Sequence, residues 1–202
     1  MAPALKILFI VAGALAAFAA VVLLSAFLRT LPCTLAAAKK YPKKTEYHGI
    51  VTIEDAIEAC RKTRKEGWAL VEYAQKLVSE KMEYSYCNSW DMPKKAFAKG
   101  RGYCWQQAGA LHLIFAGLGI ESKMVHAVKN YFPDEDLYSG HVWLRVRMGD
   151  TELDVCPGDI GNQPGVIHFK TISPVKNWNP CIAFFSYFGS AWVNANRNAH
   201  AP

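Results

Sequence analysis

The sequence predicts an α+β fold, in which helices pack on one antiparallel sheet, with a single transmembrane helix at the N-terminus. Apolar residues recur at helical spacing in the first half of the chain and alternate with period two in the second half. A third feature is an uncharged apolar run at positions 7–28. Because the helical segments precede the strands and do not alternate with them, a parallel sheet with crossover helices is disfavoured.

Residues 7–28 are expected to cross a membrane. A helix of this length spans about 33 Å, and the hydrocarbon core of a bilayer is about 30 Å thick. The run also lacks the polar face of a helix that packs on the surface of a soluble domain. A cleaved signal peptide is the alternative. Its apolar region is usually about 7–15 residues long, so the length favours an uncleaved anchor over residues 1–28.

Basic residues are distributed unevenly around this anchor. Lys6 precedes it, and five bases follow it: Arg29, Lys39, Lys40, Lys43 and Lys44. Because the more basic flank stays in the cytoplasm, a cytoplasmic domain is expected, with a secreted or extracytoplasmic location as the alternative. Prolines and a glycine in residues 29–50 predict a basic linker, so that the folded domain occupies 51–202.

The formal net charge of +6 arises from the N-terminal region alone. Residues 1–44 contain six of the 23 Lys and Arg residues and none of the 17 Asp and Glu residues. The remainder therefore holds equal numbers of acids and bases. Such a domain can neutralise few phosphates, so nucleic acid is not expected as a partner.

Three helices are predicted in the first part of the domain. Thr52 and Asp55 form a capping-box pattern before an apolar stripe through Cys60, and a second stripe runs from Val71 to about Lys81. Residues 84–103 are expected to be irregular. The third helix covers 104–118 and should end at Gly119, because its apolar positions alternate by four and three: Cys104, Ala108, Leu111, Phe115 and Leu118.

Strands are predicted in the second part. Residues 123–128 alternate weakly, and residues 141–148 alternate clearly, with Val142, Leu144 and Val146 on one face and His141 and Trp143 on the other. A turn near Gly149 leads into residues 151–155, which predicts an antiparallel hairpin. Further short strands are expected within residues 166–193.

Cys104 is the candidate nucleophile. It lies at a predicted helix N-terminus and follows four basic residues, Lys94, Lys95, Lys99 and Arg101. The helix dipole and nearby cations both favour thiolate over thiol, so we expect a lowered pKa for this cysteine. The alternative is a small buried hydrophobic residue without chemistry.

His141 and Asp154 are the candidates for a base and the residue that orients it. Parity in the hairpin places both on one face of the sheet. A Gly149-Asp150 turn would set Asp154 opposite Arg145, too far from His141. A Met148-Gly149 turn would set it opposite Trp143, one diagonal step from His141, and we favour that register. In it, Trp143 would shield the contact between His141 and Asp154 from water.

Three sequence blocks carry a family resemblance: Gly100-Arg101-Gly102-Tyr103-Cys104-Trp105, His141-Val142-Trp143 and Leu153-Asp154-Val155-Cys156-Pro157. With them, residues 65–160 resemble the transglutaminase-like domain of the papain-like superfamily. The resemblance implies a cysteine helix packed on an antiparallel sheet. It also implies a catalytic triad of Cys104 as nucleophile, His141 as general base and acid, and Asp154 as the residue that orients the imidazole.

Together with the expected anchor, the resemblance implies a membrane-anchored cysteine hydrolase or acyltransferase that attacks an amide or peptide bond through a thioester. Hydrolysis is favoured over cross-linking. The alternative is a non-catalytic transglutaminase-like module that binds peptides or scaffolds a membrane complex. The expected partners are a peptide or protein amide substrate and the membrane, and the oligomeric state is left open.

Other polar residues give weaker signals. The Cys104 backbone N–H is the first candidate oxyanion donor, and Asn88 or Trp90 could add a side-chain donor. No cofactor or metal is expected, because the histidines and cysteines lack ligand spacing and the acids at 134–136 are typical of a solvated loop. If Cys104 stays free, an odd number of cysteines remains, which favours a reducing compartment.

Overall fold

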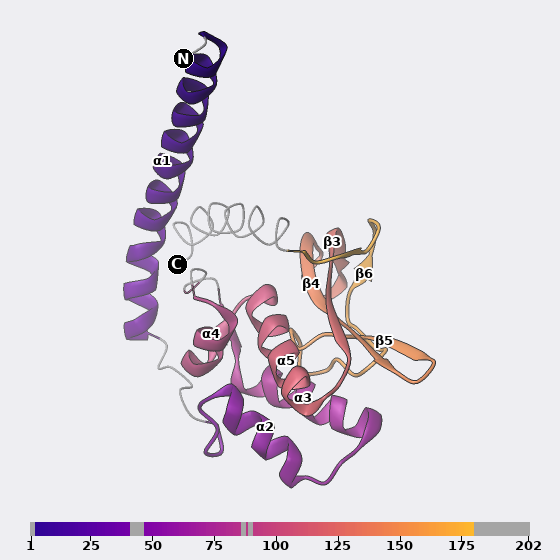
Figure 1. Cartoon of the computed structure of the whole chain (residues 1–202). Coiled ribbons are helices and arrows are strands. Elements are labelled where there is room, and N and C mark those ends of the chain that lie inside the picture. The colour runs from indigo at the N-terminus through magenta and orange to yellow at the C-terminus, as the bar shows by residue number, and fades with distance from the viewer. Residues whose placement is uncertain (1–2, 41–46, 86–87, 89–90, 180–202) are drawn as a thin grey trace.

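The computed structural model describes residues 3–40, 47–85, 88 and 91–179 (Figure 1). Helix α1 spans Pro3–Lys40, and its segment Ala4–Ser25 is long and apolar enough to cross a membrane. Side chains at 4–21 are exposed on all sides. The predicted apolar N-terminal helix is therefore confirmed. The helix continues to Lys40, through part of the segment expected as a linker, where leucines and three consecutive alanines favour helix.

Helices α2 (Ile53–Lys62), α3 (Gly67–Lys81) and α5 (Cys104–Leu118) confirm the three predicted helices. The capping box of α2 is formed: the Asp55 N–H donates to Thr52 Oγ1 at 3.1 Å, and the Thr52 N–H donates to Asp55 Oδ2 at 2.7 Å. Gly119 ends α5 in the left-handed region at φ 74°, where a glycine has no steric cost.

The expectation of an irregular segment at 84–103 is wrong. Helix α4 (Pro93–Lys99) lies within it, between two short parallel strands, β1 (Glu83–Tyr84) and β2 (Arg101–Gly102). The helix has only seven residues, so it shows no apolar period in the sequence. Its signals are Pro93 at the start and Gly100 at the end, and it buries Ala96 and Phe97.

The main sheet has the strand order β5-β4-β3-β6, and β7 also pairs with β3. The strands are β3 (Ser122–Phe132), β4 (Leu137–Met148), β5 (Thr151–Val155), β6 (Lys170–Thr171) and β7 (Lys176–Asn177). All their pairings are antiparallel, as predicted. The expected short strands beyond residue 166 include β6 and β7, and any after 179 lie outside the described residues.

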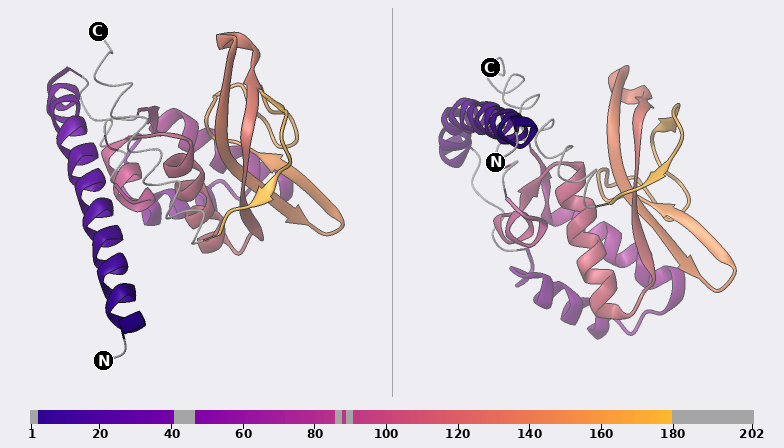
Figure 2. Two further views of the ribbon diagram at one scale, coloured as in Figure 1. Left: turned by 90° about the horizontal axis from the view of Figure 1, so that it is seen from above. Right: turned by 45° about the horizontal axis from the view of Figure 1, so that its top comes forward.

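Both faces of the sheet are buried along the middle of β4. Leu144 and Val146 pack with α2–α5 in the larger core, and the helices lie on one side of the sheet (Figure 2). On the other face, Trp143 belongs to a smaller cluster with Val125, Ala127, Cys156 and Phe169. Because side chains alternate along a strand, His141 lies on the face of this smaller cluster.

Candidate active site

Cys104 is the first residue of α5 and is half-buried. Gln106 holds the start of this helix: its Oε1 accepts the Tyr103 N–H at 3.1 Å, and its Nε2 donates to the carbonyls of Asn88 and Asp91 at 2.8 and 2.7 Å. A Cβ at Gly102 would lie only 2.8 Å from Gln106 Cβ, so a glycine is needed there. The position of the candidate nucleophile is therefore fixed by buried hydrogen bonds.

Polar groups near the Cys104 thiol favour its ionisation: the Tyr84 hydroxyl and the backbone N–H groups of Val142, Trp105 and Cys104 itself. These donors favour the thiolate, but burial opposes them and raises the pKa of Cys104 above its ordinary value. The expectation of a lowered pKa is therefore wrong. In the free protein the group is a thiol near neutral pH.

Three of the four basic residues before Cys104 form ion pairs with carboxylates. Lys94 lies 2.5 Å from Glu54, and Asp91 binds both Lys95 at 3.0 Å and Lys99 at 2.5 Å. The sequence places these lysines close to Cys104 along the chain but does not show where their side chains point. The expectation that they favour the thiolate is wrong for this reason.

His141 is enclosed by aromatic rings. Its imidazole stacks with Trp143 at 6.1 Å between centroids, and the edges of Phe169 and Phe132 approach it at 4.8 and 5.3 Å. Burial in this enclosure lowers the pKa of His141 to about 4. The imidazole is therefore neutral at physiological pH and can accept a proton. Trp143 does cover His141, although it does not lie opposite Asp154.

The favoured register of the hairpin is wrong. Strands β4 and β5 pair with Arg145 opposite Asp154, around a Gly149-Asp150 turn in which Gly149 has φ 57°. The Arg145 Nε donates to Asp154 Oδ1 at 2.7 Å. His141 and Asp154 therefore lie on the same face of the sheet, as the alternation of side chains predicts. The two side chains do not meet, because Asp154 pairs with Arg145.

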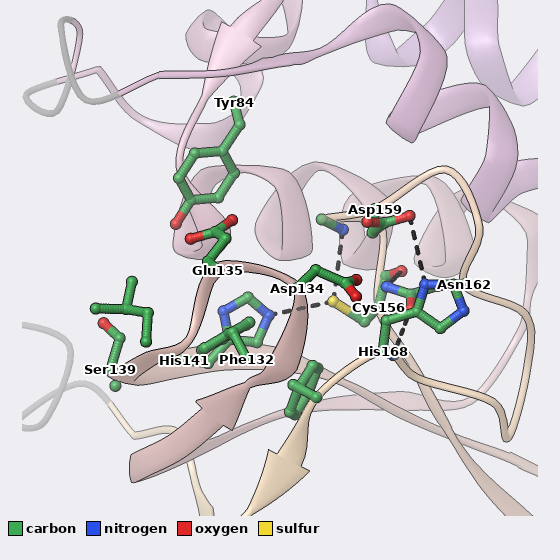
Figure 3. Close-up of a pocket in the computed structure, with 14 residues that line it drawn as sticks. Tyr84, Phe132, Asp134, Glu135, Ser139, His141, Cys156, Asp159, Asn162 and His168 are labelled. Carbon is green, nitrogen blue, oxygen red and sulfur yellow. Dashed lines mark hydrogen bonds and ion pairs between the residues drawn. The ribbon is translucent and has the colours of Figure 1, made fainter.

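Cys156 lies beside His141 instead (Figure 3). His141 Nε2 is 3.2 Å from Cys156 Sγ, and the Gly158 N–H donates to the same sulfur at 3.4 Å. The described side chains of Cys104 and His141 share no hydrogen bond, but the Val142 N–H that lies near Cys104 Sγ belongs to the residue after His141. The start of α5 and the His141 segment of β4 are therefore neighbours in the fold.

A pocket of about 240 Å³ opens over His141 and Cys156, and Cys104 is not one of its lining residues. His141, Cys156, Phe132 and Phe169 line it, together with Tyr84, whose hydroxyl lies near the Cys104 thiol. The labelled side chains of Asp134, Glu135 and Asp159 lie around the same pocket (Figure 3). A substrate group in this pocket would lie against the imidazole.

Sequence reasoning missed Tyr84, Phe132, Phe169 and Cys156 as neighbours of the site. The first three come from segments that only the folded chain brings together. Cys156 could have been found by following the Gly149-Asp150 register, which places it diagonal to His141.

The other candidates are placed as follows. The Asn88 Nδ2 donates to the Arg101 carbonyl at 2.8 Å, so this amide binds the backbone of β2. Trp90 lies outside the described residues. Within the described residues, no group of three or more His, Cys, Asp or Glu side chains could hold a metal ion. The acids at 134–136 lie in an exposed turn, as predicted.

Comparison with known proteins gives two findings. The family model described as "Transglutaminase-like superfamily" matches residues 52–155, about half of the chain. A solved structure, "a Putative Cysteine Protease from Cytophaga hutchinsonii", is similar with a TM-score of 0.45 and 11% sequence identity. The similarity covers 67% of this chain and 52% of that chain, so this chain matches about half of that protein's length. No curated protein matches.

Proposed function

Because the chain belongs to the transglutaminase-like superfamily, we propose that it is a cysteine hydrolase or acyltransferase that attacks an amide or peptide bond through Cys104. The observation that carries this proposal is that Cys104, at the start of α5, lies near the backbone N–H of Val142 in β4. Val142 directly follows His141 along that strand. The superfamily motif and the local geometry thus indicate the same pair of residues.

The reaction starts from a neutral thiol and a neutral imidazole. As the sulfur attacks the carbonyl carbon, the thiol proton moves to His141 and the carbonyl oxygen becomes negative. The backbone N–H of Cys104 is the proposed donor to that oxygen. Collapse expels the amine, which takes the proton from the imidazolium and leaves a thioester. Water or a second amine then releases the acyl group.

The sequence predicts Asp154 as the third member of a triad, but the proposed reaction does not use it. Its carboxylate would have to leave Arg145 to reach the imidazole, because the two residues form an ion pair in the hairpin. The change in Cys104 reactivity when Asp154 is replaced therefore measures the contribution of Asp154 to the reaction.

The proposed location is a membrane surface. The apolar segment Ala4–Ser25 supports an anchor, and the bases after residue 28 support a cytoplasmic domain. The proposed substrate is a peptide or protein amide. The balanced charge of the domain gives no support for a nucleic-acid partner.

The alternative function is a non-catalytic module that binds peptides. The raised pKa of Cys104 and the absence of a hydrogen bond between the described side chains of Cys104 and His141 favour it. The two functions differ in thiol chemistry. A catalytic Cys104 acquires the acyl group of an activated ester at neutral pH, whereas a merely structural thiol does not.

Labelling of the full chain in detergent with p-nitrophenyl acetate separates the two functions. Intact mass and peptide mapping should show one acetyl group on Cys104 and none in the Cys104→Ala variant. Cys60 is an internal control, because burial raises its pKa to about 11 and it lies in the helical core. Equal labelling of Cys60 and Cys104, or of neither, would contradict the enzymatic function.

A further inference from the structure

We propose that Cys156 positions the imidazole of His141, in the place predicted for Asp154. The proposal rests on the proposed function of Cys104 and His141. Three observations carry it: the register of the hairpin, the contact between sulfur and imidazole, and the hydrogen bonds that fix the backbone of Cys156.

The register brings Cys156 to the required place. Leu144 pairs with Val155 at the end of β5, so the next step along both strands brings Cys156 level with Trp143. This is one diagonal step from His141, a separation that side chains can bridge. A residue that orients the imidazole was expected at this diagonal position, and Cys156 occupies it.

The contact engages one nitrogen of the ring. His141 Nε2 lies 3.2 Å from Cys156 Sγ, and His141 Nδ1 is left to accept the proton of the nucleophile. In this arrangement Nε2–H donates to the sulfur, which also accepts the Gly158 N–H. A thiol is a weaker acceptor than a carboxylate and carries no charge, because burial raises the pKa of Cys156 to about 12. Cys156 therefore fixes the ring and its tautomer without adding a negative charge.

Buried amides hold the backbone of Cys156 in place. Its carbonyl accepts hydrogen bonds from Gln75 Nε2 and Asn162 Nδ2, both at 3.1 Å. The Ser79 hydroxyl donates to the carbonyl of the next residue, Pro157, at 2.8 Å. Helix α3 therefore anchors the segment that follows β5, so the backbone that carries the sulfur cannot move away from His141 without breaking these hydrogen bonds.

The test follows the tautomer of His141 by 15N NMR in the full chain in detergent, with His141→Gln used to assign its signal. We expect the Nε2–H tautomer in the wild type and a mixture of tautomers in Cys156→Ala. Cys156→Ser keeps a small hydrogen-bonding group and should restore the wild-type tautomer. Two controls should leave it unchanged: Asp154→Asn, which removes the charge paired with Arg145, and Cys60→Ala, which truncates another buried cysteine.

Acetylation of Cys104 provides the second measurement on the same variants. Cys156→Ala should slow it about tenfold or more, as part of the roughly 10²–10⁴-fold contribution of a positioned base. Cys156→Ser should recover most of the rate, and both control variants should react at the wild-type rate.

The outcomes separate this proposal from the proposed function. An unchanged His141 tautomer in Cys156→Ala, or a changed one in Asp154→Asn, would overturn the positioning role. Acetylation of Cys156 in place of Cys104 would overturn it too, because Cys156 would then be the nucleophile. If the tautomer changes in Cys156→Ala while wild-type Cys104 is never acetylated, the positioning contact is supported and the proposed function is overturned.

Discussion

Arg145 and Asp154 face each other across the β4–β5 hairpin, with Arg145 Nε 2.7 Å from Asp154 Oδ1. Both side chains are between one quarter and one third exposed. An ion pair in such a position contributes little to folding, because solvent screens it and ordering both side chains costs entropy. The Asp154 carboxylate, which was predicted to orient His141, is nevertheless bound to Arg145 in this pair.

Replacing Asp154 by Asn should therefore have a small effect. We expect a loss of about 1 kcal/mol or less in the free energy of unfolding and less than about a threefold change in Cys104 acetylation. Urea denaturation and the acetylation rate measure the two effects, with Arg145→Gln as the matched partner variant. A large loss of acetylation in Asp154→Asn but not in Arg145→Gln would restore Asp154 to the triad.

The stability of the domain should depend on pH through His141. Its pKa is lowered to about 4 in the folded chain, against 6.5 when unfolded. Between these values the unfolded chain binds a proton that the folded chain does not, so stability falls as pH falls through this window. The loss amounts to roughly 3 kcal/mol and ends below about pH 4.

Denaturation of the wild type and His141→Gln between pH 7 and pH 4 isolates this effect. Other histidines are common to both proteins, so the difference between their curves reports His141 alone. The wild type should lose more stability on acidification than the variant. Parallel curves would show that His141 titrates normally in the folded protein.

The aromatic enclosure explains why the pKa of His141 is low. Phe132 forms one wall of it and is only partly buried, so Phe132→Ala admits water to the imidazole with limited damage to the core. We expect the pKa of His141 to rise toward 6.5 in this variant, as measured by NMR titration. Phe97→Leu is a control, because it alters the helical core away from the imidazole. An unchanged His141 pKa in Phe132→Ala would assign the shift to other contacts.

Much of the local structure could be predicted from the sequence. The start of α2, the end of α5 and the alternation along β4 follow from neighbouring residues, so periodicity and capping rules identify them. The short helix α4 was not predicted, because seven residues are too few to show the helical period of apolar positions.

The site was only partly predictable, since it depends on contacts between distant segments. Moving the turn by one residue exchanges Asp154 for Cys156 beside His141, and the two turns are almost equally compatible with the sequence. Packing alone turns Lys94 and Lys99 toward carboxylates. It also brings Phe169 against His141.

The start of α5 provides a test of how the nucleophile is held. A Cβ at Gly102 would lie 2.8 Å from Gln106 Cβ and 2.9 Å from Gln106 Oε1. Gly102→Ala should displace Gln106, lower stability by about 1–3 kcal/mol and slow acetylation of Cys104. Gly119→Ala, at the other end of the same helix, strains a φ of 74° at a comparable cost of about 1–2 kcal/mol. If both variants slow acetylation equally, the effect is one of stability alone.

The orientation of the anchor is tested in intact cells. The five bases after residue 28 predict that the domain faces the cytoplasm. Protease added outside should leave the domain uncut until the membrane is permeabilised, as followed with a C-terminal epitope. Cleavage of the domain before permeabilisation would contradict the predicted orientation.

The most direct test of the account is the rate of Cys104 acetylation at pH 7 in wild type and His141→Gln. The thiol of Cys104 and the imidazole of His141 are both neutral in the free protein, so the thiol should react only while His141 takes its proton. We predict that His141→Gln slows acetylation at least about 100-fold, while urea denaturation shows that the variant remains folded. Equal rates in the two folded proteins would contradict the assignment of His141 as the base for Cys104.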